Sequence, residues 1–133
     1  MLAHELIAAT FPFLKSDDIA RLLQICEQNG SLFYFPEEKE LLGYYRFFPE
    51  LIYAVADQDY DTLLRCDLTE GPLLYVAVLI TQKNGLRMVS TIVKTLRARA
   101  YAFHRYRQDE WEFHFVKNNR YLAQTGLNYA SQQ

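Results

Sequence analysis

Residues 73–80 have the sequence LLYVAVLI, an unbroken apolar run that is rich in β-branched and aromatic side chains. Such a run is typical of a central β-strand that is covered on both faces. The turn-forming stretch Thr81–Gly85 ends the run, and apolar residues then recur at helical spacing from Leu86 to Ala100. The next apolar segment, Tyr101–Arg107, predicts a second strand. Because a strand, a crossover helix and a strand normally pair in parallel, this unit fixes the middle of a sheet.

The segment before this unit predicts two helices that pack against the sheet. Leu2–Phe11 fits a short helix that ends before Pro12. Ser16 is predicted to cap the start of a second helix, which ends at Asn29-Gly30. One face of the second helix carries an apolar stripe of Ile19, Leu22, Leu23 and Cys26.

Short strand patterns follow these helices. Ser31–Phe35 and Leu41–Phe48 predict two antiparallel strands that are joined by a turn at Pro36–Lys39. Leu51–Ala56 favours a third strand, although a helical turn fits the same residues. Asp61–Leu68 predicts one or two turns of helix.

The chain beyond Tyr101 predicts a β-hairpin. Its strands, Tyr101–Arg107 and Trp111–Lys117, flank a polar loop at residues 108–110. A three-residue loop would pair His104 with His114, on the face opposite a buried set of Phe103, Phe113 and Phe115. A two-residue loop remains open as an alternative, and it would undo that pairing because a one-residue slip moves every side chain to the other face. Residues 119–133 would cover a sheet edge or trail loosely.

The length and composition predict a single domain over residues 1–133. Half of the residues are hydrophobic, and the ten Tyr and nine Phe favour a sheet-rich core. We expect an α+β fold whose mixed, mostly antiparallel central sheet has flanking helices and one parallel crossover. Cys26 and Cys66 are predicted to be reduced thiols, which suits a cytoplasmic location. No run has the length of a membrane span and the N-terminus lacks a signal-peptide pattern, so we expect no membrane contact.

Charge is divided unevenly along the chain. Residues 1–82 hold 5 Lys/Arg and 13 Asp/Glu, whereas residues 83–120 hold 9 Lys/Arg and 3 Asp/Glu. An acidic half beside a basic half fits a phosphate-bearing ligand, an oppositely charged partner or a homo-oligomer. A solvated surface fits the same pattern, so charge alone does not choose among these interpretations.

The acidic segment at residues 57–61 does not predict a metal site. Asp57, Asp59 and Asp61 alternate as in a calcium-binding loop. The required glycine is missing, however, and Leu68 stands where such a loop has a bidentate glutamate. A solvated acidic turn is the better interpretation.

The order of these elements resembles the acyl-CoA N-acyltransferase fold of the GCN5-related N-acetyltransferases, over roughly Ser16 to Lys117. In that family the loop after the fourth strand carries the motif Gln/Arg-x-x-Gly-x-Gly/Ala, whose amides at a helix start hold the pyrophosphate of coenzyme A. Here Gln82-x-x-Gly85 matches, whereas Arg87 stands where the family has a small residue. The resemblance implies that the chain binds an acyl-coenzyme A and transfers its acyl group to an amine acceptor.

The resemblance also implies where the cofactor and the catalytic groups would lie. The pantetheine arm would lie beside the end of the central strand, and the pyrophosphate would meet the amides that follow it. Family members place a tyrosine, the usual general acid, on a helix between the fifth strand and the last hairpin; that helix is missing here, so no tyrosine is carried over. The residues implied in coenzyme A binding are Leu79, Ile80, Thr81, Gln82, Lys83, Asn84, Gly85, Leu86 and Arg87.

Three titratable residues near the expected cleft remain as catalytic candidates: His104, Tyr106 and His114. A histidine can accept the amine proton, because its ordinary pKa lies near 6.5. Simple packing on the sheet surface is the alternative interpretation of all three. A zinc site would need a third ligand, for which only Glu112 or the distant His4 is available, so we predict none.

Two further function classes remain open. One is a non-catalytic binding or structural module on the same fold, which the missing helix and the incomplete motif favour. The other is binding of single-stranded nucleic acid, because basic and aromatic side chains are interleaved near the C-terminus. The residues of this pattern are Arg97, Arg99, Tyr101, Phe103, Arg105, Tyr106, Arg107, Trp111, Phe113, Phe115, Lys117 and Arg120.

Overall fold

Five strands form one mixed sheet in the computed structural model, which describes residues 1–82 and 85–117. Their spatial order is β1-β2-β3-β4-β5, and of the four pairings β3 with β4 is parallel while the others are antiparallel. The strands are β1 (Leu32–Phe35), β2 (Glu40–Phe47), β3 (Leu73–Ile80), β4 (Ala100–Arg107) and β5 (Glu110–Lys117). The α+β class, the mixed sheet and the parallel crossover are therefore confirmed.

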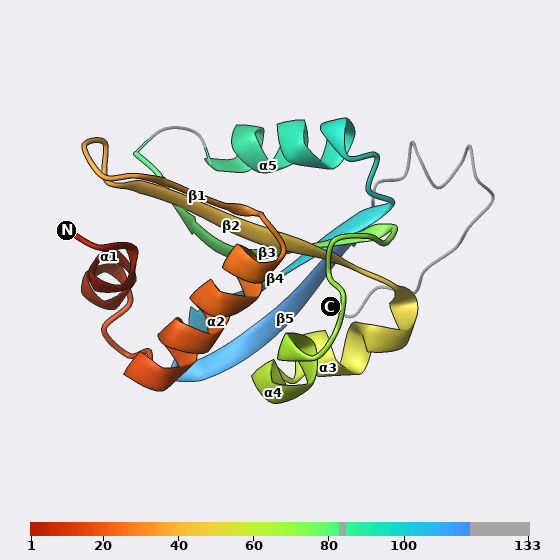
Figure 1. The fold of residues 1–133 in the computed structure, drawn as a ribbon, viewed down its shortest axis with the longest axis horizontal. Helices are drawn as coiled ribbons and strands as arrows, with labels where there is room; N and C mark the ends of the chain where they lie inside the picture. The colour runs from red at the N-terminus through yellow and green to blue at the C-terminus, as the bar shows by residue number, and fades with distance from the viewer. Residues whose placement is uncertain (83–84, 118–133) are drawn as a thin grey trace.

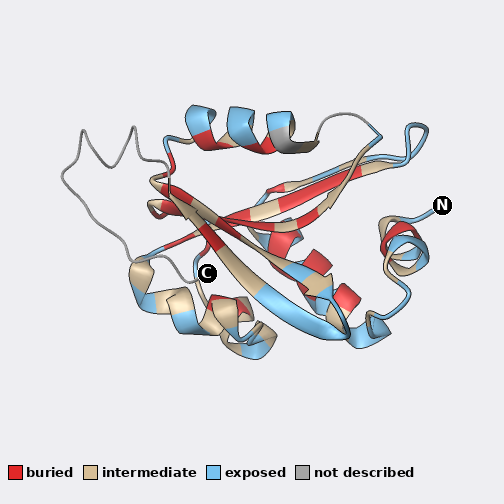
Figure 2. Ribbon diagram, turned by 180° about the vertical axis from the view of Figure 1, so that it is seen from behind, coloured by how far each residue is buried: buried red, intermediate tan, exposed pale blue. Residues whose placement is uncertain are grey.

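Helices cover both faces of this sheet (Figure 1). Helix α5 lies over one face, whereas α1, α2, α3 and α4 lie over the other. The helices are α1 (Ala3–Thr10), α2 (Ser16–Gln28), α3 (Ile52–Ala56), α4 (Tyr60–Leu64) and α5 (Gly85–Thr95), with a 3-10 turn at Pro49–Leu51. The centre of the sheet is buried between these layers, whereas the tip of the β4–β5 hairpin is exposed (Figure 2). None of the described helices is long and apolar enough to cross a membrane.

The central strand forms where the sequence predicts it. Leu73 packs into the core under α3 and α4, and Leu74 packs into the core under α5. Both side chains are almost fully buried, so β3 is covered on both faces as its unbroken apolar run implies. The two N-terminal helices, the β1–β2 hairpin and the crossover helix also form, although α5 ends at Thr95, before the last predicted apolar position.

The segment Leu51–Ala56 is not the predicted third strand. Pro49 starts a 3-10 turn, and the chain continues directly into α3. Proline favours this position because its missing N–H would have no partner in the first helical turn. The side chains follow the helix, since Val55 is buried whereas Tyr53 is 78% exposed. The short apolar run fitted both structures, and the preceding proline favours the helix.

Helix α2 starts one residue earlier than a cap at Ser16 requires. Lys15 is the N-cap and makes no side-chain capping bond, so the predicted role of Ser16 is wrong. The Ser16 hydroxyl instead lies 3.3 Å from Nε2 of His4, which joins the start of α2 to α1. The predicted stop is correct, because Gly30 follows the helix with a φ of +66°.

The β4–β5 hairpin has a two-residue loop, so the three-residue register is wrong. Both loop residues, Gln108 and Asp109, have positive φ, which is the geometry of the turn that matches the twist of paired strands. His104 therefore pairs with Phe113, and Phe103 pairs with His114. The predicted set of three phenylalanines is split, because Phe103 lies on the α5 face and the other two lie on the opposite face.

Strand β3 contains a β-bulge in its second half. Gly43 of β2 pairs with Val78, and Tyr44 pairs with Val76, so Ala77 is an extra residue without a partner on β2. The bulge turns Ala77 and Val78 toward the same side, where both pack against the apolar cluster of α1 and α2.

The parallel seam between β3 and β4 is short. It consists of three residue pairs, from Leu73 with Ala100 to Tyr75 with Ala102. The bulge at Ala77 follows directly and bends β3. Beyond the parallel seam the two strands no longer pair, so their facing edges diverge.

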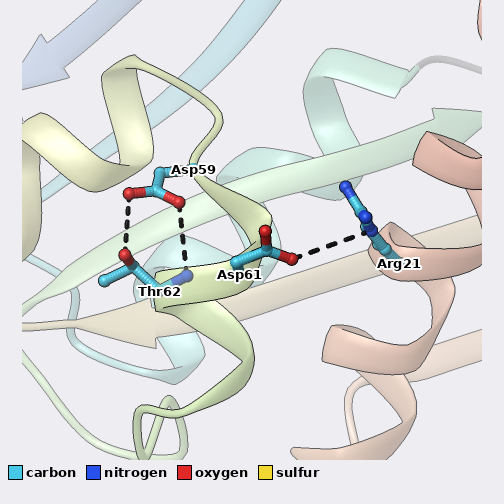
Figure 3. Close-up of polar contacts among 4 residues, drawn as sticks. All are labelled: Arg21, Asp59, Asp61 and Thr62. Atoms are coloured by element: carbon cyan, nitrogen blue, oxygen red, sulfur yellow. Dashed lines mark hydrogen bonds and ion pairs between the residues drawn. The ribbon is translucent and has the colours of Figure 1, made fainter.

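The predicted acidic turn has structural roles (Figure 3). Asp59 is the N-cap of α4, and its carboxylate accepts hydrogen bonds from the Thr62 N–H at 3.3 Å and the Thr62 hydroxyl at 2.7 Å. Asp61 lies 3.8 Å from Arg21 of α2 in an exposed ion pair. Among the residues described, no three His, Cys, Asp or Glu side chains group to hold a metal ion.

We expect Asp59→Ala to lower the melting temperature at neutral pH, because it removes the cap of α4. The hydrogen bonds from Thr62 lower the pKa of Asp59 below its ordinary value of 3.8. The stabilisation is therefore present above that pH and is lost as the pH falls through the folded-state pKa. Thermal unfolding at pH 7 and in acid checks this, with Asp57→Ala as the matched control. Equal melting temperatures for the two variants at pH 7 would contradict the capping role.

Candidate functional site

A cavity of about 570 Å³ lies between β3 and β4 beyond the parallel seam. Its volume is in the range of small-molecule sites. Val76–Leu79 of β3 and Phe103–Tyr106 of β4 line it, so it lies between the diverging strands. It also reaches both faces of the sheet, because α5 contributes Gly85 and Val89 on one side. The lining residues from α1, α2 and the loop between them are Ile7, Phe11, Phe13, Leu14 and Leu22.

Two strand edges face this cavity without pairing to each other. The pairing of β3 with β4 ends at Tyr75 and Ala102, whereas both strands continue for several residues. Backbone N–H and C=O groups on such open edges can pair with an extended ligand. Strand β2 supports the other edge of β3, and β5 supports the other edge of β4. The open edges therefore belong to a firmly held sheet.

Helix α5 begins beside the cavity, at Gly85. A Cβ atom on Gly85 would lie 3.0 Å from Cδ2 of Leu79 and 3.2 Å from Cγ2 of Thr81, so the start of the helix approaches β3 closely. The first N–H groups of a helix have no partner within the helix and carry partial positive charge. An anionic group at this end of the cavity would therefore be stabilised.

The predicted catalytic residue His104 lines the cavity, but both of its ring nitrogens are engaged. Nε2 lies 2.8 Å from the Ala56 carbonyl oxygen, and Nδ1 lies 2.6 Å from the Tyr75 hydroxyl. A carbonyl only accepts, so Nε2 carries the proton and the neutral ring accepts from Tyr75 at Nδ1. The imidazole thus connects β3, β4 and α3, and its lone pair is already used.

The surroundings of His104 keep it neutral. Burial lowers its pKa below the ordinary 6.5, the hydrogen bond to Ala56 opposes this change, and the nearby His114 lowers the pKa further. Burial also raises the pKa of Tyr75 far above 10, the Tyr60 phenol adds to the rise, and a side-chain hydrogen bond with Gln58 opposes it. The Tyr75–His104–Ala56 chain is therefore an uncharged structural network.

The second candidate, Tyr106, lines the cavity within an aromatic cluster. Its ring stacks on Phe13 with the ring centroids 3.9 Å apart, and Trp111 contacts it edge-on at 5.1 Å. Phe13 and Trp111 are 42% and 41% exposed, so this cluster lies where the cavity meets solvent. No described hydrogen bond engages the Tyr106 hydroxyl, which leaves its proton available within the described part of the chain.

The third candidate, His114, is not among the described residues that line the cavity. It lies on the face of β5 opposite His104 and stacks on Phe103, with the ring centroids 5.0 Å apart. Its Nε2 is buried without a hydrogen bond to any described residue, and Glu112 Oε1 lies 3.8 Å away. The structure thus brings Tyr106 and His104 together and separates His114 from them.

The predicted cofactor residues are divided in the same way. Leu79 and Gly85 line the cavity, whereas Ile80 packs against the apolar cluster of α1 and α2. The Thr81 hydroxyl donates a hydrogen bond to Glu40. Gln82 and Arg87 are exposed, and Leu86 belongs to the first turn of α5. The predicted contacts of Lys83 and Asn84 lie outside the described residues.

The interleaved basic and aromatic residues do not form one stacking surface. Phe115 is 3% exposed within the core, and Phe113 packs against the same core cluster. Tyr101 and Phe103 pack on the opposite side, under α5. Arg120 and the segment 119–133 lie outside the described residues. These four aromatic side chains are therefore used for packing, whereas Tyr106 and Trp111 lie at the solvent-exposed end of the cavity. The nucleic-acid hypothesis gains no support from this arrangement.

Sequence reasoning missed the loop between α1 and α2 and the partners of His104. Phe11, Phe13 and Leu14 line the cavity from that loop. Their signal was an apolar cluster around Pro12 in a segment too short for a helix or a buried strand. The contacts of His104 with Tyr75 and Ala56 join segments far apart in the chain, and no local pattern encodes them.

The chain matches no known family model, no curated protein and no solved structure. The geometry of the cavity is therefore the basis for a functional proposal.

Proposed function

We propose that this domain has the acyl-CoA N-acyltransferase fold and binds an acyl-coenzyme A in the cavity between β3 and β4. The observation that carries the proposal is the divergence of two parallel strands at a β-bulge, beside the start of their crossover helix. This arrangement surrounds one cavity with two open strand edges and a helix N-terminus.

The chemistry of coenzyme A fits these groups. Its pantetheine arm is extended and carries amides, which can pair with the open edge of β3 at Val76–Leu79 as an added strand would. Its pyrophosphate is anionic, and the N-terminus of α5 at Gly85 favours such a group. The thioester would then lie near the parallel seam, between the two strands.

The proposed reaction is direct transfer of the acyl group to an amine. The amine nitrogen forms a bond to the thioester carbon, the carbon–sulfur bond breaks, the amine loses a proton and the thiolate gains one. Of the three predicted catalytic residues, Tyr106 best fits the role of the acid that donates a proton to the thiolate. Its hydroxyl lies at the cavity without a described hydrogen-bond partner. His104 fits a positioning role, because both of its nitrogens are already bonded.

A non-catalytic module that binds the same ligand is the second candidate. The observation that favours it is the use of the His104 lone pair by Tyr75, which leaves no described histidine free at the cavity to accept the amine proton. Release of free thiol from acetyl-coenzyme A in the presence of amines separates the two candidates. We expect release to fall at least tenfold in Tyr106→Phe if the domain is catalytic. Binding without thiol release for any amine would support the non-catalytic module.

We expect coenzyme A and acetyl-coenzyme A to raise the melting temperature in low salt, because a ligand that binds only the folded state stabilises it. The gain is about 2.7 kcal/mol at a hundredfold excess over the dissociation constant. Gly85→Val should remove this gain, because the added atoms meet Leu79 and Thr81 and displace the start of α5.

The control is Ser90→Val, on the exposed side of the same helix, which should keep the full gain. If millimolar coenzyme A derivatives leave the melting temperature of the unmodified chain unchanged, the acyl-coenzyme A proposal is wrong.

A further inference from the structure

We infer that the acyl group is an apolar chain of medium length, held between α1 and α2; this inference rests on the proposed function. The relevant part of the cavity is an inner compartment, defined by the side chains of Ile7, Phe11, Leu14, Leu22 and Val78.

The inner compartment is the buried end of the cavity. Ile7 is fully buried, Val78 is 6% exposed and Leu22 is 8% exposed. These side chains belong, with Phe11 and Leu14, to one apolar cluster between α1, α2 and the sheet. A ligand group that enters here leaves water and is surrounded by apolar side chains.

The β-bulge connects this compartment to the strand edges. Ala77 and Val78 both face α1 and α2, and Ala77 also lines the cavity. Ala77 has a small side chain and lines the same cavity as the inner compartment, so the edge of β3 at the proposed thioester position and the compartment belong to one cavity. Neutral polar groups of Gln58 and Tyr60 line the same side and suit a thioester carbonyl rather than a charge.

The described lining has no group that could balance a buried ammonium ion. It contains no Asp, Glu or Lys, and its arginine, Arg105, is exposed and lies on the α5 face of β4. An unpaired charge is strongly unfavourable in an apolar site. The inner compartment therefore selects a hydrocarbon group.

The acyl chain is a hydrocarbon group of the kind that the inner compartment selects, whereas the acceptor is not. An acceptor brings a polar nitrogen that must reach the thioester carbon, which suits the solvent-exposed end at Phe13 and Trp111. The acyl chain is attached to the thioester and beyond the carbonyl carries no polar atom. The cavity thus divides into a buried end for the acyl chain and an exposed end for the acceptor.

The test is a series of dissociation constants of the full chain for coenzyme A and its acetyl, butanoyl, hexanoyl and octanoyl thioesters, measured by calorimetry. We expect each added methylene to tighten binding about fourfold until the inner compartment is full. Acetyl-coenzyme A should bind about as tightly as coenzyme A.

Leu14→Trp checks where the chain lies. Leu14 is half-buried in the α1–α2 loop, so a larger side chain fills the inner compartment without entering the centre of the core. We expect it to weaken octanoyl-coenzyme A binding at least tenfold and to leave coenzyme A binding unchanged. The matched control is Leu2→Trp, at a leucine that is 70% exposed, and it should bind every thioester as the unmodified chain does.

Each remaining outcome overturns a defined part of this account. Equal affinity for all thioesters overturns the acyl-chain inference and leaves the proposed function intact. The affinity for the thioesters could also be independent of chain length while the chain binds octylamine and Leu14→Trp removes that binding. This result would overturn the acyl-chain inference and assign the inner compartment to the acceptor. The affinity could also rise with chain length and fall by the same factor in Leu14→Trp and Leu2→Trp. That result would indicate adhesion of the acyl chain to the protein surface, and it would overturn the acyl-chain inference. Failure of every coenzyme A species to bind overturns the proposed function itself.

Discussion

Replacing Gly71 with alanine is expected to prevent the domain from folding stably. Gly71 has a φ of +137°, and a Cβ atom there would lie 2.3 Å from the Phe47 carbonyl oxygen. That oxygen cannot move away easily, because Phe47 pairs with Leu73 in the sheet. The Gly71 carbonyl also accepts a hydrogen bond from Arg46 at 2.9 Å, which fixes the segment before β3. We expect a loss of more than about 4 kcal/mol, a large part of the stability of a domain of this size.

Gly30→Ala is the matched control for this experiment. Gly30 also has a positive φ, of +66°, but nothing lies within 4 Å of the position of its Cβ. Gly30→Ala should therefore lower the free energy of unfolding by about 1 kcal/mol, which is the strain of an alanine in the left-handed region. Urea unfolding of both variants measures the two losses. Similar losses would show that backbone conformation rather than the contact with Phe47 determines the requirement for glycine.

Opposite results are expected when His104 and His114 are each replaced by phenylalanine. His104→Phe leaves the Ala56 carbonyl and the Tyr75 hydroxyl without this partner. Tyr75 keeps its side-chain hydrogen bond with Gln58, whereas the Ala56 carbonyl loses the partner that His104 provides. An unpaired buried polar group costs about 1–3 kcal/mol, so the free energy of unfolding should fall by about this amount. His114→Phe removes a buried Nε2 that has no described hydrogen bond and keeps the ring stacked on Phe103. It should leave the stability unchanged or raise it.

The pH dependence gives this comparison a second readout. The pKa of His104 is lowered by burial, so the unfolded chain takes up a proton at a higher pH than the folded chain. The contribution of neutral His104 is therefore complete above pH 6.5 and is lost as the pH falls through the folded-state pKa. Unfolding free energies between pH 8 and pH 5 should fall less steeply in His104→Phe than in the unmodified chain. Equal slopes would show that His104 titrates alike in both states and would contradict its buried network.

The middle of the fold was predictable because its signal is local. The apolar run of β3 and the helical spacing of α5 each arise from residues that are neighbours in the chain. The parallel pairing then follows from the general handedness and length of such crossovers. The segment Leu51–Ala56 was ambiguous for the same reason, since six apolar residues do not span enough turns to separate helix from strand.

The cavity was not predictable in the same way, because it depends on register. The two-residue loop at Gln108-Asp109 lacks the glycine that usually marks such turns, so the faces of β4 and β5 were assigned wrongly. The bulge in β3 had one signal, Gly43 within the partner strand. A Cβ on Gly43 would lie 2.9 Å from Val78 and 3.0 Å from Cys26, so the glycine permits the close packing beside the bulge. Neither contact is visible without the fold.

The short parallel seam also divides the backbone pairing of the sheet into two parts, the β4–β5 hairpin and strands β1–β3. The β4–β5 hairpin closes through a two-residue loop, whereas its three pairs with β3 join residues that are separated by the whole crossover helix. Loop closure over that distance is entropically unfavourable, and few pairs oppose it. Backbone pairing therefore joins the hairpin to the β1–β3 part through few residues, and the buried cluster that contains Tyr75, Ala102 and Phe115 supplies most of the contact between the two parts. A molecule bound across the open edges of β3 and β4 adds contacts between the two parts of the sheet. It would therefore raise the cooperativity of unfolding as well as the midpoint of the unfolding transition.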